Sequence, residues 1–197
     1  LFEWELGERS FFKPALDVLP RPEQYDTPSW WSEEDFKLLK GSALYSRVRS
    51  RKKEVDDMYR KYSKKCPAIG ERFTVKDWRW AVEAVLSRVF GVKTKKRSSV
   101  TSSHGKNHLV VMVPFADMAN HHENANTTWK FDDGMDSFIV TAKEAIPKGT
   151  EIYDSYGNKD SDTMLQNYGF IPEVPKDGNK PVSEQQGKAM TRLPMCV

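Results

Sequence analysis

The chain has 197 residues with 31 basic and 28 acidic side chains, so its formal net charge at pH 7 is only +3. This length can bury a core of its own, and so small a net charge does not call for a nucleic-acid partner. Cys66 and Cys196 are too few for a disulfide framework and lack zinc-ligand spacing. No long apolar run and no signal-peptide pattern occurs, so we expect an intracellular protein outside the membrane, with cytoplasm, nucleus and plastid all open.

The first half of the chain predicts helices. The predicted helical ranges are 1–6, 32–39, 43–65 and 74–90, with a short turn and a Pro-rich connection between the first two. The last range has the clearest apolar stripe, with Thr74 as its predicted cap and Gly91 as its predicted end. Arg88 falls at the edge of that stripe, which places a fixed positive charge beside the predicted core face.

Short strand patterns replace the helical ones after a polar loop rich in Lys, Arg and Ser. The predicted strands are 109–113, 127–131, 137–142 and 151–156. Asp132-Asp133-Gly134 is a hairpin signal, Ile146 to Gly149 is a predicted turn, and 161–168 is a predicted short helix. Helices first and short antiparallel strands second predict an α+β fold.

Asp117, His121, His122 and Glu123 are candidates for a metal site, since Asp and His four apart share one face of a helical turn. A zinc or iron site requires a further ligand at a defined distance, and the remaining two histidines lie in or beside the polar loop. We therefore predict no metal site. A Ser/His/Asp hydrolase is weaker still, because no serine lies in a nucleophile-elbow pattern.

The most specific pattern is formed by four short segments. They are, in chain order, Arg88-Val89-Phe90, Pro114 to His121, Ser155-Tyr156-Gly157 and Tyr168-Gly169-Phe170. Their order and spacing resemble those of the SET-domain protein methyltransferases, in the subclass typified by the Rubisco large-subunit methyltransferase. The likeness extends backward through the helical half and covers nearly all of residues 1–173.

This resemblance implies a SET fold of short antiparallel strands with a large helical insert and a knot-like carboxy-terminal segment. The implied division is a helical insert and loop at 1–108, a carboxy-terminal SET core at 109–173, and a tail or linker at 174–197. Nothing before Arg88 resembles the Gly-rich turn and strands with which the family begins. We therefore expect a monomeric catalytic fragment that lacks the amino-terminal cofactor-binding strands.

The resemblance implies S-adenosylmethionine as the cofactor. Arg88 matches the family's arginine that pairs with the cofactor carboxylate, and a guanidinium fork suits that group. The segment 117–121 matches the cofactor loop, and 168–170 matches the segment that closes over the cofactor. The implied cofactor-binding residues are Arg88, Asp117, Met118, Ala119, Asn120, His121, Tyr168, Gly169 and Phe170.

Tyr156 matches the family's catalytic tyrosine. Methyl transfer is an in-line displacement by a neutral amine, so alignment and local electrostatics supply most of the acceleration. Phe90 favours a lysine acceptor, because an aromatic ring holds a cation whereas a histidine prefers a polar partner for its ring nitrogen. The implied substrate-binding residues are Phe90, Asp154, Tyr168 and Phe170, although Asp154 stands where the family usually has an apolar residue.

The sequence therefore predicts a protein-lysine N-methyltransferase that acts on a protein with an exposed lysine. Two other classes stay open at this point. One is a non-catalytic SET-like module that binds a protein partner, and the other is a metal-dependent enzyme.

Overall fold

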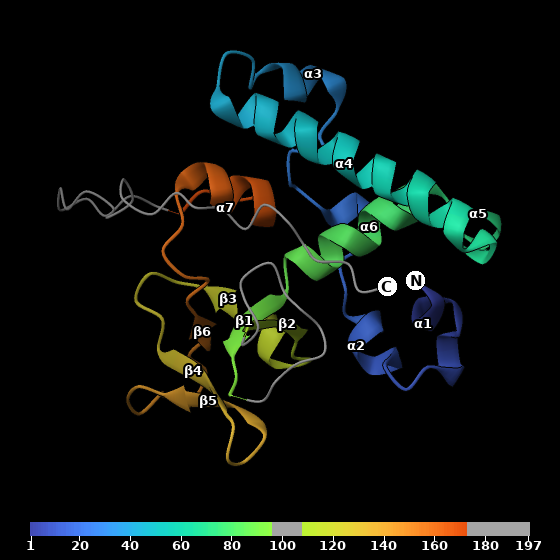
Figure 1. The fold of residues 1–197 in the computed structure, drawn as a ribbon. Coiled ribbons are helices and arrows are strands. Elements are labelled where there is room, and N and C mark those ends of the chain that lie inside the picture. Colours follow the sequence, from blue (N-terminus) through green and yellow to red (C-terminus); the bar gives the residue numbers. More distant parts are fainter. Residues whose placement is uncertain (96–107, 173–197) are drawn as a thin grey trace. The chain divides into compact units, whose positions relative to one another are not determined.

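The computed structural model describes residues 1–95 and 108–172 (Figure 1). They form two compact units, of which the first is Leu1–Ser87 together with the segment that begins at Asp160, and the second is Arg88–Lys159. The predicted boundary between 108 and 109 does not coincide with this division, and the predicted tail at 174–197 lies outside the described residues. Among the described residues we find no helix with the length and hydropathy that crossing a bilayer requires.

The first unit is helical, as its apolar spacing predicts. Its helices are α1 (Phe2–Glu5), α2 (Lys13–Asp17), α3 (Glu33–Lys37), α4 (Ala43–Lys65), α5 (Pro67–Arg72), α6 (Val75–Leu86) and α7 (Ser161–Tyr168), with short 3-10 turns at Gly7–Arg9 and Pro22–Gln24. The side chains of Ser32, Ser42 and Thr74 each accept a main-chain N–H in the first turn of α3, α4 and α6. These caps satisfy donors that a helix start leaves without partners.

A small core joins α3, α4 and α7 within the first unit. Phe36, Leu44 and Val48 are buried together, and Leu165 of α7 packs against them. Two long-range hydrogen bonds add to this packing, from the Arg47 side chain to Thr163 at 3.1 Å and from the Arg51 side chain to Asn167 at 2.7 Å. The helix that follows the strands in sequence therefore belongs structurally to the helical unit.

Gly169 ends α7 in a conformation that favours glycine. Its φ is +83°, and its N–H bonds the Leu165 carbonyl at 3.1 Å. A Cβ at this position would lie 3.1 Å from the carbonyl carbon of Asp26 and 3.2 Å from the nitrogen of Thr27. Both contacts are to main chain, which cannot move aside as a flexible side chain would.

We expect Gly169→Ala to lower the free energy of unfolding by about 1 to 3 kcal/mol. Alanine is strained at a positive φ, and its Cβ would press against the main chain. Chemical denaturation measures this loss. Gly91→Ala is the matched control, because a Cβ at Gly91 meets nothing within 4 Å and its backbone is ordinary strand. Equal stability of the two variants would contradict the expected role of Gly169.

The second unit consists of three two-stranded sheets and a short turn. Its elements are β1 (Val89–Lys93), β2 (His108–Met112), η3 (Ala116–Met118), β3 (Asn120–His121), β4 (Thr127–Asp132), β5 (Ser137–Ala142) and β6 (Tyr153–Asp154). β1 pairs with β2 and β4 with β5, both antiparallel, whereas β3 pairs with β6 in parallel. The α+β class and the 132–134 hairpin are confirmed, and β3 with β6 adds one parallel pair to the predicted antiparallel strands.

The predicted helix over 74–90 is too long. α6 ends at Leu86, Val89 and Phe90 belong to β1, and Gly91 lies inside that strand rather than at a helix end. The cause is a partner distant in sequence: Val89 lies opposite Met112 and Phe90 opposite Val111, so strand pairing overrides the helical spacing. The predicted strand over 151–156 shortens to β6, and α5 was not expected from the sequence.

Candidate functional site

Arg88 and Asp117 meet in the second unit. Arg88 occupies the turn between α6 and β1 rather than a helical stripe, and Asp117 lies in η3, the turn that follows β2. Nη1 of Arg88 donates to the main-chain carbonyl of Asp117 at 3.0 Å and lies 3.9 Å from its carboxylate oxygen Oδ2. The two side chains are only 16% and 8% exposed, so this pair is largely withdrawn from water.

Arg88 still has a donor to offer. Its Nε is buried and has no hydrogen-bond partner among the described residues. A buried donor without an acceptor is costly, and native structures leave few of them. Burial raises the pKa of Asp117, an effect that Arg88 partly offsets. The carboxylate of S-adenosylmethionine is an acceptor of the kind that this Nε lacks, so the predicted role of Arg88 fits the structure.

The loop before Asp117 has an unusual backbone. Phe115 has a φ of +79°, which a residue with a side chain rarely adopts, and its side chain is 89% exposed. Such strained positions cluster at functional sites, where the surrounding structure holds them. Sequence reasoning gave no sign of it, because the strain depends on how Pro114 and η3 turn the chain.

Tyr156 is hydrogen-bonded to the same loop. Its phenol donates to the carbonyl of Ala119 at 3.0 Å, and its main-chain N–H donates to Nδ1 of His121 at 3.1 Å. The rings of His121 and Tyr156 have centroids 5.2 Å apart. Burial is the main cause of a raised pKa for Tyr156, with Arg88 opposing it, so the phenol is a neutral donor at pH 7.

His121 is held as a neutral imidazole. It lies opposite Asp154 in the β3–β6 pair, and its Nδ1 must carry a lone pair to accept from Tyr156. Burial lowers the pKa of His121, Lys159 and His122 lower it further, and Glu123 and Asp154 act in the opposite direction. The native state therefore binds this proton less readily than the unfolded chain does.

Stability should consequently decline as the pH falls through about 6.5, because protonation of the unfolded chain begins there, and the loss is complete below the folded pKa of His121. His121→Asn keeps an acceptor near the Nδ1 position and cannot titrate. Denaturation curves of both proteins between pH 8 and pH 5 measure the effect. We expect the wild type to lose more stability than the variant, and parallel curves would count against this role of His121.

Asn120 is engaged by a residue that the sequence did not single out. Its Nδ2 donates to Oε1 of Glu151 at 2.7 Å, and Oε2 of Glu151 accepts from the Tyr153 phenol at 3.0 Å. Its neighbour Met118 is 51% exposed, and Ala119 contributes its carbonyl to Tyr156. The predicted cofactor loop is thus tied to β6 and to Glu151, two residues before that strand.

Phe90 belongs to an aromatic cluster in the second unit. Its ring centroid lies 5.2 Å from that of Trp129 and 4.9 Å from that of Phe138, and both contacts are edge-to-face. Trp129 and Phe138 stack on each other at 5.1 Å across the β4–β5 hairpin. Asp154, the other predicted substrate residue in this unit, is only 7% exposed.

The structure gathers most of the predicted site residues in the second unit. Tyr168, Gly169 and Phe170 instead lie at the end of α7, in the first unit, where the Tyr168 and Phe170 rings have centroids 6.3 Å apart. In the part of the chain that the structure describes, no three His, Cys, Asp or Glu side chains come together as metal ligands would.

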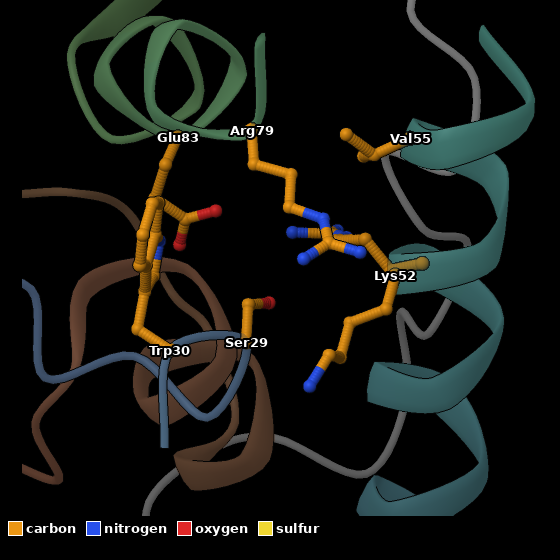
Figure 2. Close-up of a pocket in the computed structure, with 7 residues that line it drawn as sticks. Ser29, Trp30, Lys52, Val55, Arg79 and Glu83 are labelled. Atoms are coloured by element: carbon orange, nitrogen blue, oxygen red, sulfur yellow. The ribbon is translucent and has the colours of Figure 1, made fainter. Parts of the chain in front are cut away.

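A pocket in the first unit contains none of the predicted site residues. Figure 2 shows Arg79 and Glu83 reaching into it from α6, and Lys52 and Val55 from α4. Arg79 donates two hydrogen bonds to the Asp56 carboxylate, from Nε at 2.7 Å and from Nη2 at 2.6 Å. Burial raises the pKa of Glu83. The Arg79–Asp56 ion pair joins α6 to α4, and we assign this pocket a structural role.

Comparisons with known proteins agree with the predicted family. A model of the family described as "SET domain" matches residues 21–157. The actin-histidine N-methyltransferases of Mus musculus and Homo sapiens are 29% and 28% identical over 172 residues, which is 82% of this chain. The chain spans only 27% of each of these relatives.

Solved structures give the same result. The SET domain of LSMT bound to methyllysine and AdoHcy has a TM-score of 0.67 and 26% identity, over 87% of this chain and 38% of that one. Rubisco LSMT bound to AdoMet has a TM-score of 0.62 and 26% identity, over 84% of this chain and 36% of that one. The predicted resemblance and fold are confirmed, and the solved relatives hold the cofactor or its demethylated product.

Proposed function

The chain belongs to the SET-domain family, and on that premise we propose that it is the catalytic part of an S-adenosylmethionine-dependent protein methyltransferase whose acceptor is a lysine side chain. The main support for the proposal is that one compact unit contains Arg88, Asp117 and Tyr156, with Arg88 bonded to Asp117 and close enough to affect the pKa of Tyr156. We also propose that the protein is intracellular, which is consistent with a chain that has only two cysteines.

Arg88 and Tyr156 have roles that their contacts support. S-adenosylmethionine supplies a methyl group that is activated by the neighbouring sulfonium. The Nε of Arg88, which has no partner among the described residues, would donate to the cofactor's carboxylate, and Asn120 and its neighbours would hold the rest of the cofactor. The neutral Tyr156 phenol, fixed by the Ala119 carbonyl, orients the lone pair of the acceptor amine.

Two kinds of acceptor have support from the relatives. The curated relatives are named for a histidine acceptor, whereas solved structures are described with lysine or methyllysine bound. Phe90 favours lysine, because its ring belongs to an aromatic cluster that suits a cation, and Phe90 itself has no polar atom for a histidine ring nitrogen.

The test is transfer of labelled methyl from S-adenosylmethionine to defined peptides by the full chain. One peptide library carries a single lysine in varied contexts, a second carries histidine at the same position, and a third carries acetyl-lysine. Label in the lysine peptides alone supports the proposal. Label in the histidine peptides alone would support methyltransferase activity but contradict lysine as the acceptor. Absence of transfer, with S-adenosylmethionine bound, favours a non-catalytic module.

A further inference from the structure

Tyr156 is fixed through its main chain as well as through its phenol. Its N–H bonds His121 at 3.1 Å and its phenol bonds the Ala119 carbonyl at 3.0 Å. Its own carbonyl accepts a hydrogen bond from Nζ of Lys159, three residues later. The direction of the phenol therefore depends on the short turn from Tyr156 to Lys159.

Lys159 folds back across this turn. Gly157 has a φ of +86°, and a Cβ on it would lie 3.4 Å from Nζ of Lys159, so the ammonium crosses directly over the glycine. The Lys159 side chain is half-buried, and desolvation lowers its pKa while Asp154 raises it. A lysine that folds back over a partly buried turn differs from the usual solvated surface lysine.

Asp154 is the acidic residue whose charge favours the protonated form of Lys159. It is 7% exposed, its main-chain carbonyl accepts from the His122 N–H at 3.1 Å, and it lies opposite His121 in the parallel pair. Burial raises its pKa, while Ser155, His121, Lys143 and Lys159 lower it. Asp154 is thus a buried acidic residue at the end of β6, two residues before Tyr156.

We infer that Lys159 is a positioning residue for Tyr156. The inference rests on the proposed function, since it assumes that Tyr156 orients the acceptor amine. Lys159 acts through the Tyr156 carbonyl and is not itself assigned a contact with substrate. Loss of its hydrogen bond frees the turn at Gly157, so the phenol and the acceptor amine are no longer aligned.

The test compares Lys159→Met, which keeps the length of the side chain without its donor, with Lys159→Arg, which restores a cationic donor. Lys148→Met is the matched control, because Lys148 is an exposed lysine in another turn of the same unit. Two measurements are made on the full chain: the tyrosine ring signals in an NMR spectrum with labelled tyrosine, and methyl transfer to the lysine peptides together with calorimetric binding of S-adenosylmethionine.

We expect Lys159→Met to shift the Tyr156 signal and to lower kcat roughly tenfold to a hundredfold, with cofactor binding within twofold of wild type. Lys159→Arg should recover most of kcat. An unchanged Tyr156 signal in Lys159→Met, or an equal loss of kcat and cofactor affinity, would overturn the inference. If the wild type transfers no methyl group, the proposed function fails, while the NMR comparison still decides whether Lys159 holds Tyr156.

Discussion

Replacing Arg88 by alanine is expected to weaken the binding of S-adenosylmethionine by about 1.5 to 3 kcal/mol, or roughly ten- to 150-fold. The variant removes a charge-assisted donor whose Nε is buried and has no partner among the described residues. It also removes the bond from Nη1 to the Asp117 carbonyl at 3.0 Å, which holds the start of the predicted cofactor loop. Calorimetric titration of the cofactor into wild type and variant measures the loss directly.

Two further variants distinguish a specific loss of cofactor binding from a general loss of stability. Arg88→Lys keeps the charge but lacks the planar fork, so we expect an affinity between those of wild type and Arg88→Ala. Arg60→Ala removes an exposed arginine of α4 whose partner is Asp57, and it should leave cofactor affinity unchanged. If Arg88→Ala binds as tightly as Arg60→Ala, the cofactor carboxylate lies elsewhere.

The sequence predicts those elements whose signals are local. α4 begins at Ala43 and ends at Lys65 as its apolar spacing indicates, and Ser32 and Thr74 cap the helices that follow them. The end of α6 could not be read in the same way, because Phe90 leaves the helix to pair with Val111, twenty-one residues later. Helical spacing is a local property, whereas strand pairing depends on the partner.

The same distinction applies to the site. Arg88, Asp117 and Tyr156 could be named from the order of short segments, but their contacts depend on tertiary structure. Glu151 and Lys159 carry no motif, and they reach the site only because β6 pairs with β3 and the chain then turns at Gly157. The sequence therefore indicates the candidate site residues, while the residues that hold them in place become visible only in the fold.

Tyr156→Phe is expected to reduce kcat for methyl transfer about a hundred- to a thousandfold, the usual loss when one aligned hydrogen-bonding group is removed from a reacting centre. The variant keeps the aromatic ring beside His121 and the main-chain bond to its Nδ1. Only the phenol oxygen disappears, together with its 3.0 Å bond to the Ala119 carbonyl. Cofactor binding should therefore change little, and steady-state kinetics with a lysine peptide should show a loss in kcat.

Tyr59→Phe is the matched control, because the Tyr59 phenol also donates to a main-chain carbonyl, that of Phe73, at 2.7 Å. Both variants lose one hydrogen bond, which costs about 1 kcal/mol of stability in either unit. If stability were the whole effect, the two proteins would lose activity alike. A selective loss in Tyr156→Phe would separate chemistry from folding, since only that phenol belongs to the unit that holds Arg88 and Asp117. If Tyr156→Phe showed wild-type turnover, the phenol would have no role in the reaction, and Tyr156 would be a packing residue.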